Sequence, residues 1–147
     1  MRFLPSARGF TLIELMVTLT IVALGAALAG VAFRDSAQSA LERDAARLAA
    51  LLEAGRALSR ATGVPVQWRV AGRGFVFDGL PPGRAPMPTR WLDAATAAQA
   101  PAPLLLGPDP IIAPQSVLLH RQGSATRLQV STDGLRPFAV STAQAAP

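Results

Sequence analysis

The chain has 147 residues, of which 50% are hydrophobic and 16% charged, with 14 basic residues (all Arg) against 9 acidic ones and a formal net charge of +5. Globular chains carry roughly 25% charged residues, so this balance predicts that part of the chain lies outside water. The lack of Cys excludes a disulfide framework and thiolate metal sites. A single His and no Tyr leave little acid–base chemistry for an enzyme.

The excess of apolar residues is concentrated near the N-terminus. Residues 10–33 read FTLIELMVTLTIVALGAALAGVAF and carry one charge, Glu14. A helix of about 20 apolar residues crosses a bilayer core, so this stretch is predicted to be a transmembrane and assembly helix. Residues 1–9 form a polar leader, in which Arg2 and Arg8 are expected to hold the N-terminus on the cytoplasmic side.

Two simple interpretations of this segment leave Glu14 unexplained. The first is an ordinary secretory signal, removed at the small residues of Ala27–Ala29, and the second is a plain membrane anchor. An acidic residue within a membrane helix costs roughly 2.5–3.5 kcal/mol, and neither a signal peptide nor an anchor gains anything in return. The unexplained cost of Glu14 therefore favours a third interpretation.

The third interpretation depends on a short motif. Gly9-Phe10-Thr11-Leu12-Ile13-Glu14 resembles the cleavage and assembly motif of type IV pilins and type II secretion pseudopilins. The resemblance implies cleavage by prepilin peptidase after Gly9, N-methylation of Phe10, and retention of the apolar helix as a single pass through a bacterial inner membrane. It also implies that Glu14, about 6 Å along the helix from Phe10, forms a salt bridge with the Phe10 ammonium of a neighbouring subunit.

Residues 34–62 continue the helix with an amphipathic pattern. A stripe of apolar residues recurs at helical spacing: Leu41, Ala45, Leu48, Leu52 and Leu58. The charged pairs Asp44/Arg47 and Glu53/Arg56 are expected on the solvated flank, where each adds a few tenths of a kcal/mol. A helix from Phe10 to about Ala61 would be roughly 78 Å long, and its second half is expected to pack on the domain that follows.

Residues 63–147 are predicted to form a periplasmic antiparallel β domain. Val66, Trp68 and Val70 alternate with polar residues and are followed by a Gly-containing turn and a second strand at 75–77. Further strands are predicted at 116–121, 126–131 and 137–141. Between them, residues 79–116 hold nine of the 13 Pro, which predicts a loop with a short edge strand near 104–106, held to the core by Trp91 and Leu92.

The C-terminal region narrows the resemblance. Ala45–Gly63, followed by a Trp-bearing strand and a Gly-aromatic hairpin, resembles the GspH/FimT group of minor pseudopilins and minor pilins, as does the closing turn Asp133–Phe138. This implies an α+β, pilin-like fold with a long N-terminal helix packed on an antiparallel β-sandwich. It also implies a structural minor pseudopilin of the H type, assembled at or near the tip of a type II secretion pseudopilus. The implied partners are major and minor pseudopilins, prepilin peptidase and inner-membrane lipid.

Two other functions stay open at this point: a minor pilin of a type IV pilus, with a role in assembly, adhesion or DNA uptake, and a generic exported β-domain protein with a removable signal. No catalytic set, metal site or cofactor motif is found, so we expect no enzyme. His120 is a lone histidine in a strand-like run and is expected to be structural, and Asp109 and Asp133 flank turn-forming residues.

Three arginines are candidates for a weak nucleic-acid patch. Arg121, Arg127 and Arg136 come from neighbouring predicted strands and would contact phosphates if they gathered on one face. Dispersed surface charge is the preferred interpretation, because no Tyr is available for base stacking and both Trp are expected to be buried. Nucleic acid is therefore not expected as a partner.

Overall fold

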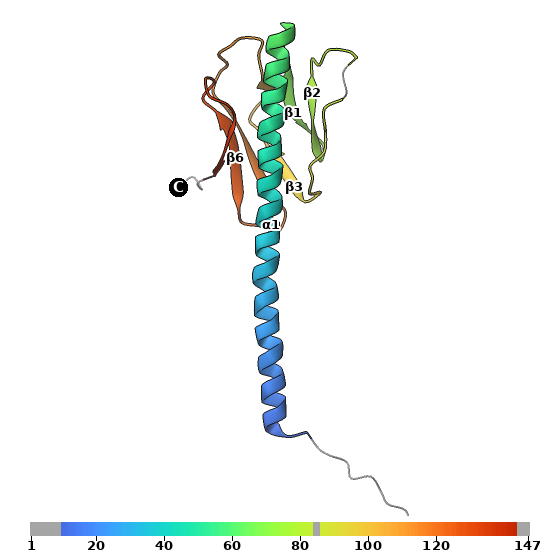
Figure 1. The fold of residues 1–147 in the computed structure, drawn as a ribbon, viewed down its shortest axis with the longest axis vertical. Helices are drawn as coiled ribbons and strands as arrows, with labels where there is room; N and C mark the ends of the chain where they lie inside the picture. Colours follow the sequence, from blue (N-terminus) through green and yellow to red (C-terminus); the bar gives the residue numbers. More distant parts are fainter. Residues whose placement is uncertain (1–9, 84–85, 144–147) are drawn as a thin grey trace, which may run out of the picture. The chain divides into compact units, whose positions relative to one another are not determined.

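The structure, a computed structural model of the chain, describes residues 10–83 and 86–143, without the side chains of residues 27–35. The chain divides into two compact units, Met1–Asp35 and Ser36–Pro147 (Figure 1). The leader predicted at residues 1–9 lies outside the described residues. The elements are α1 (Leu12–Thr62), β1 (Gln67–Ala71), β2 (Gly74–Asp78), β3 (Thr96–Gln99), β4 (Leu104–Leu105), β5 (Gln115–Arg121), β6 (Arg127–Thr132) and β7 (Ala139–Thr142).

Helix α1 confirms the long helix that the apolar periodicity of the sequence predicted. In the second unit its apolar stripe is buried; the members that are at most 1% exposed are Leu41, Ala45, Leu48 and Leu52. The helix ends where Gly63 adopts a positive φ of 70° and donates its N–H to the Ser59 carbonyl at 2.9 Å. A glycine in the left-handed conformation is a common helix terminator, and Pro65 follows two residues later.

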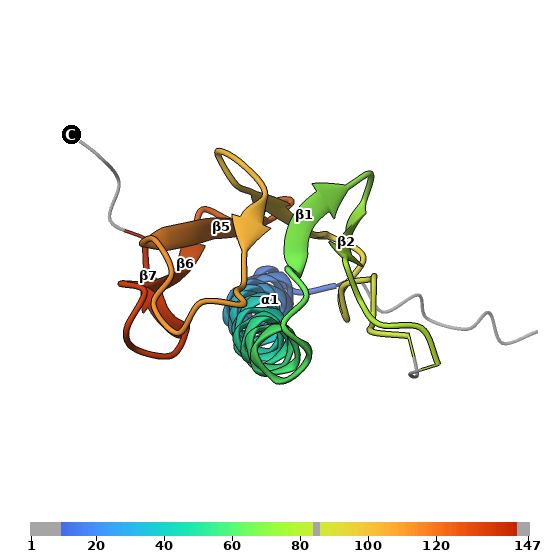
Figure 2. The same cartoon turned by 90° about the horizontal axis from the view of Figure 1, so that it is seen from above.

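The strands of the second unit form two antiparallel sheets, ordered β2-β1-β4 and β3-β5-β6-β7. In Figure 2, β1 and β2 lie beside β5, β6 and β7, with α1 against the same side of both groups. A single apolar core takes side chains from α1 and from both sheets. The α+β class with antiparallel strands is confirmed. The expected β-sandwich is not, because the two sheets adjoin in one layer over the helix.

The sequence of β6 explains why a single layer packed against the sheets is enough to bury their apolar face. Leu128, Val130 and Thr132 are buried, whereas the alternating positions hold Arg127, Gln129 and Ser131. An antiparallel sheet with one apolar and one polar face packs on a single layer and leaves the other face in water. Helix α1 supplies that layer, so the outer polar face needs no second sheet.

A side chain joins the two sheets at their seam. The Leu105 N–H of β4 donates to Gln115 Oε1 at 2.7 Å, and Gln115 Nε2 donates to the Leu105 carbonyl at 2.8 Å. The carboxamide of Gln115 thus makes the two bonds that a backbone peptide group of a neighbouring strand would make. Since Gln115 opens β5, this contact links the edge of one sheet to the other.

The Pro-rich loop predicted for residues 79–116 is more ordered than expected. It contains β4, as predicted, and also β3, which pairs with β5 from Thr96 opposite Arg121 to Gln99 opposite Leu118. Thr-Ala-Ala-Gln has no alternating pattern, and Ala is depleted in strands, so local sequence does not predict β3. The free edge of β5 supplies the pairing partner.

Arg56 ties the helix to two loops and corrects its predicted place on a solvated flank. Its side chain is 3% exposed. Arg56 Nη2 donates to the carbonyls of Gly134 at 2.6 Å and Pro110 at 3.1 Å, and Nη1 donates to the carbonyl of Arg136 at 3.2 Å. One buried guanidinium therefore satisfies carbonyls from the Pro-rich loop and from the turn between β6 and β7.

Glu53 completes this contact. Its Oε1 accepts the Phe138 N–H at 2.9 Å and lies 3.7 Å from Arg56 Nη1. The (i, i+3) pair expected from the sequence is therefore present, but it faces the C-terminal loop instead of open solvent. In the same loop Gly134 is required, because a Cβ there would overlap the Ile112 carbonyl oxygen and φ is 92°.

We predict that Arg56→Met destabilises the second unit. The substitution keeps the aliphatic stem but removes one hydrogen bond from each of three loop carbonyls. The Gly134 and Arg136 carbonyls keep the Ile112 N–H and the Thr132 hydroxyl as donors, whereas the Pro110 carbonyl keeps none among the described residues. A hydrogen bond to a charged group contributes about 1.5–3 kcal/mol, and an unsatisfied buried group costs about 1–3 kcal/mol. The free energy of unfolding of the full chain in detergent micelles should fall by about 2–4 kcal/mol. Urea unfolding followed by the fluorescence of Trp68 and Trp91, both in this unit, measures the change.

Arg60→Met is the matched control, because Arg60 is exposed on the same helix and its side chain makes no hydrogen bond or ion pair with the described residues. It should change the free energy by less than about 1 kcal/mol. Equal effects of the two substitutions on the free energy of unfolding would show that the Arg56 hydrogen bonds do not stabilise the second unit.

Candidate functional site

The start of α1 carries the residues that the sequence motif singled out. Gly9 lies outside the described residues, and Phe10 is 76% exposed directly before the helix. Thr11 caps the helix, since its Oγ1 accepts the backbone N–H of Glu14 at 3.3 Å. Glu14 thereby stands in the first turn, where a carboxylate interacts favourably with the helix dipole.

This geometry gives Glu14 a second interpretation. Thr-x-x-Glu at a helix start is the pattern of a capping box, in which Glu returns a hydrogen bond to the cap residue. The described residues show only the Thr11 half of that exchange, and no cation or donor among them contacts the Glu14 carboxylate. A cap role and an intersubunit charge role therefore make different predictions for Gln at this position.

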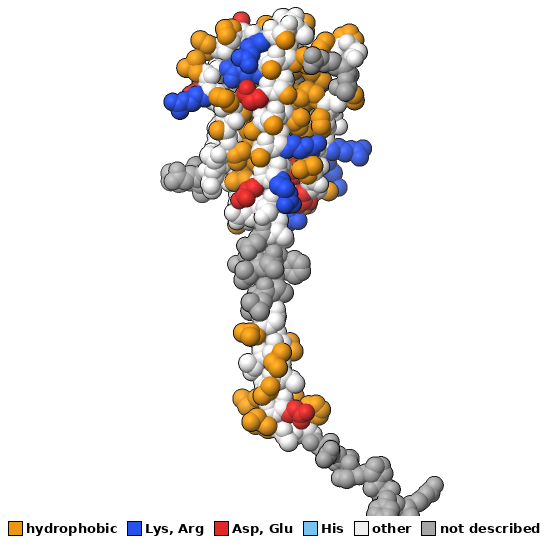
Figure 3. Space-filling model, viewed as in Figure 1, with side chains coloured by type: hydrophobic (Ala, Val, Ile, Leu, Met, Phe, Trp, Pro, Cys, Tyr) orange, Lys and Arg blue, Asp and Glu red, His pale blue; other side chains and the backbone are white. Residues whose placement is uncertain are grey.

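Apolar side chains surround the first turns of α1. Ten large apolar residues are between 52% and 79% exposed: Phe10, Leu12, Ile13, Leu15, Met16, Val17, Leu19, Ile21, Val22 and Leu24. Thr18 and Thr20 donate their hydroxyl protons to carbonyls one turn back, at 2.8–2.9 Å, so they offer no unpaired donor. Figure 3 shows this segment as hydrophobic atoms around one acidic group. Among the helical segments that the structure describes, none meets the length and apolarity needed to cross a membrane.

A helix that is apolar on all sides is stable in water only when other apolar surface covers it. Glu14 adds a polar requirement, because a carboxylate enclosed by that cover needs a cation or a hydrogen-bond donor. The site therefore combines a helix surface that is apolar on all sides with one carboxylate near its end.

In the second unit, two charged residues of α1 hold the segment before β3. Asp44, predicted on the solvated flank, is 1% exposed and accepts the N–H groups of Leu92 at 2.7 Å and Asp93 at 3.1 Å. Arg47 Nη1 donates to the Arg90 carbonyl at 2.9 Å. The expected Asp44–Arg47 pair is thus replaced by two separate contacts with the loop, whose backbone α1 fixes.

Asp93 in this segment pairs with Arg121, whose Nε donates to Asp93 Oδ2 at 2.6 Å. The backbone N–H of Ala95, at 2.9 Å, and then the Arg121 guanidinium stabilise the ionised form and hold the pKa of Asp93 below its usual value of 3.8. Arg121 is therefore occupied by an acid of its own chain and is not free for an external phosphate.

The structure does not bring the three candidate nucleic-acid arginines together. Arg121 ends β5 and Arg127 begins β6, at the same end of the sheet, where His120 pairs with Arg127. Arg136 follows the other end of β6, with its side chain 87% exposed, and it lies 3.7 Å from Asp133. His120 sits on the sheet between Ala97 and Arg127. Groups of acidic and histidine side chains suited to a metal ion are absent from the described part of the chain.

Asp133 has the turn role that the sequence indicated. Its Oδ1 accepts the N–H groups of Arg136 at 2.7 Å and Leu135 at 2.9 Å, which lowers the pKa of Asp133 below its usual value. Trp91 partly packs against the core, as expected, but it stays partly exposed, and the Leu92 side chain is exposed to solvent. The loop is held through its backbone more than through Leu92.

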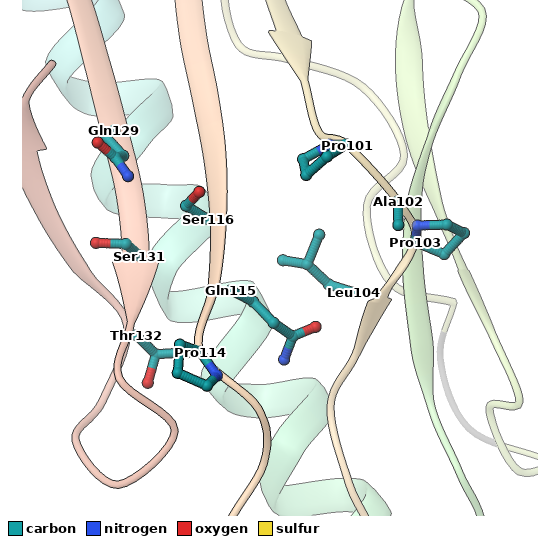
Figure 4. Close-up of a pocket in the computed structure, with 10 residues that line it drawn as sticks. All are labelled: Pro101, Ala102, Pro103, Leu104, Pro114, Gln115, Ser116, Gln129, Ser131 and Thr132. Atoms are coloured by element: carbon teal, nitrogen blue, oxygen red, sulfur yellow. The ribbon is translucent and has the colours of Figure 1, made fainter. Parts of the chain in front are cut away.

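Two of the hollows in the described part of the second unit are relevant to function. One, of about 420 Å³, lies at the seam of the two sheets, between the Pro101–Leu104 segment and β5 and β6 (Figure 4). Its side chains are amides, hydroxyls, prolines, one alanine and one leucine, without an acid or a histidine. The other, of about 380 Å³, is lined by two arginines and two aromatic rings and lies at the β1–β2 hairpin. Sequence reasoning missed it, because its residues come from a turn and from the Pro-rich loop.

Residues 4–30 match the family model of the prokaryotic N-terminal methylation motif. No curated protein and no solved structure matches the chain. The motif match supports a type IV pilin-like protein that is processed by prepilin peptidase and assembles with other pilin-like proteins. Because the match ends before the second unit, it does not separate pseudopilins from pilus subunits.

We predict that Asp93→Asn makes the stability of the second unit less dependent on acid. The lowered pKa of Asp93 means that its ionised form stabilises the fold above the unfolded pKa, and that this contribution is lost as pH falls through the folded pKa. The difference in unfolding free energy between wild type and variant should be constant above about pH 5 and shrink below it. Urea unfolding of the full chain across this pH range measures the difference, and a gap that does not vary with pH would contradict the assignment.

Proposed function

We propose that the chain is a structural minor pseudopilin of the H type in a type II secretion system, with no catalytic activity of its own. The observation that carries the proposal is the start of α1: large apolar side chains exposed around the helix, and one carboxylate, Glu14, unpaired among the described residues. The methylation motif over residues 4–30 supports processing next to this segment.

In this role prepilin peptidase cleaves after Gly9, and the new N-terminus, Phe10, is methylated. The apolar segment holds the protein in a bacterial inner membrane as a single pass, with the second unit in the periplasm. On assembly, neighbouring apolar helices replace lipid around the segment, and Glu14 pairs with the Phe10 ammonium of a neighbouring subunit. Pairing a charge inside an apolar bundle fixes the register of one subunit on the next.

A minor pilin of a type IV pilus is the alternative function, because the same N-terminal chemistry serves both assemblies. The resemblance of Ala45–Gly63 and Asp133–Phe138 to the GspH/FimT group supports either one. Neighbouring genes separate them: a secretin, a secretion ATPase and a major pseudopilin indicate secretion, whereas pilus genes indicate a pilus. A generic exported β-domain protein, the remaining alternative, predicts removal of the apolar segment.

We predict that the membrane-bound protein begins with N-methyl-Phe10. Cleavage after Gly9 removes residues 1–9 and leaves the apolar helix in the mature chain. Intact-mass and N-terminal peptide analysis of the purified protein measures both changes. A first residue beyond the apolar segment, at Gly30 for example, would exclude the pilin-like processing and leave the exported-protein alternative.

We predict that Glu14→Gln is inserted and cleaved normally but is not incorporated into filaments. Gln keeps the size and the capping capacity of Glu but leaves the neighbouring ammonium without its counter-charge. Breaking a buried ion pair on one side costs about 3–5 kcal/mol, which corresponds to a loss of incorporation of about a hundredfold or more. Glu14→Ala should behave in the same way. Co-sedimentation with sheared filaments and the amount of exported protein are the readouts.

Thr11→Ala is the control for the cap. It removes the hydroxyl that accepts the Glu14 N–H, at a cost of about 1 kcal/mol of helix stability, while the carboxylate stays in place. Incorporation should therefore be retained. If Glu14→Gln assembles and Thr11→Ala does not, Glu14 acts as a helix cap and the assigned salt bridge is wrong.

A further inference from the structure

The residues that line the hollow at the β1–β2 hairpin have no part in the assembly role proposed above. We call it the Trp91 hollow; it is lined chiefly by Arg73, Phe75, Thr89, Arg90 and Trp91 and has a volume of about 380 Å³. The rings of Phe75 and Trp91 lie with their centroids 4.6 Å apart. Phe75 is 1% exposed, so the partly exposed Trp91 ring supplies the accessible apolar surface. The two arginines are exposed beside these rings.

The walls of the Trp91 hollow are held by backbone contacts. The Phe75 N–H donates to the Thr89 carbonyl at 2.9 Å, so the loop runs along β2 as an extra partner. A side chain at Gly74 would collide with the same carbonyl, which explains a glycine at the start of β2. On the other side, Arg47 holds the Arg90 carbonyl. The shape of the hollow is therefore fixed before any ligand arrives, which lowers the entropic cost of binding.

Arg73 and Arg90 are available cations. Neither guanidinium pairs with an acid of the described chain, and no acidic residue lines the hollow. Two other arginines of this unit are occupied: Arg69 pairs with Asp78 at 2.8 Å, and Arg121 pairs with Asp93. The hollow therefore has a local positive charge that its own chain does not neutralise.

These residues match one kind of ligand best. Guanidinium groups bind carboxylates through paired, charge-assisted hydrogen bonds, and the partly exposed Trp91 ring offers a contact for an apolar side chain. Arg and Trp are also the residue types that most often dominate protein–protein binding energy. A nucleic acid fits less well, because it presents a run of phosphates and bases, whereas the hollow offers two free arginines and one partly exposed Trp ring.

We propose that the Trp91 hollow docks an acidic segment of a partner protein, with one or two carboxylates on Arg73 and Arg90 and a neighbouring apolar side chain against Trp91. The partner is defined by this chemistry and not by the kind of filament. The inference therefore holds for a pseudopilin and for a pilus subunit alike, and its test does not require filament formation.

The experiment uses the full chain in detergent micelles and an array of short fluorescein-labelled peptides in which Asp or Glu alternates with Leu or Phe. Each peptide has a twin with Asn or Gln in place of the acids. Fluorescence anisotropy should show binding of acidic peptides at least about tenfold tighter than of their twins. Binding should also quench the fluorescence of Trp91, and Trp91→Phe should remove that quenching while keeping an aromatic ring in place.

Arg73→Gln/Arg90→Gln should weaken peptide binding at least about tenfold. The matched control is Arg60→Gln/Arg136→Gln, which loses the same charge from exposed arginines that do not line the hollow and should bind as wild type does. Unchanged urea unfolding verifies that both variants are folded.

Four results would overturn the proposal. Three of them are equal binding of acidic peptides and their twins, equal weakening by the two double variants, and tighter binding of a single-stranded oligonucleotide with the same dependence on Arg73 and Arg90. Self-association that is lost in Arg73→Gln/Arg90→Gln, without peptide binding, would assign the hollow to a second copy of the chain and would also overturn it.

Discussion

The second unit depends on polar side chains that α1 directs into its own packing surface. A helix stripe of Leu and Ala explains why the sheets lie on the helix, but it does not fix the long irregular segments between the strands. Arg56 and Asp44 do that, the first by donating to loop carbonyls and the second by accepting loop N–H groups. Buried backbone groups must find partners, and here one helix supplies partners at both ends of the domain.

Periodicity predicted much of this fold from the sequence. The helix, the β1–β2 hairpin and strands β5, β6 and β7 follow from apolar spacing and turn residues, because those signals are local. Strand β3 was missed because its pairing is provided by β5, about 20 residues further along the chain. Glu53/Arg56 was predicted as a surface pair for the same reason: (i, i+3) spacing identifies neighbours on the helix but not the carbonyls that a distant loop brings to it.

The two candidate sites also differ in whether local sequence is enough to identify them. Phe10 and Glu14 form a contiguous motif at one helix end, so the sequence alone identifies them and suggests their role. Arg73, Arg90 and Trp91 are separated in sequence and come together because the loop pairs with β2 and α1 holds its backbone. Trp91 was predicted to be buried, as Trp usually is in a small domain, and its partial exposure is visible only in the folded chain.

Gln115 has a consequence for how this protein behaves in a crowded assembly. A strand edge with free N–H and C=O groups is a template for unwanted pairing with another chain, and β4, two residues long, ends its sheet. By satisfying both polar groups of Leu105, the Gln115 amide closes that edge without adding a strand. Protection against edge-to-edge aggregation at this seam thus depends on a single side chain, and substitution of Gln115 alone would remove it.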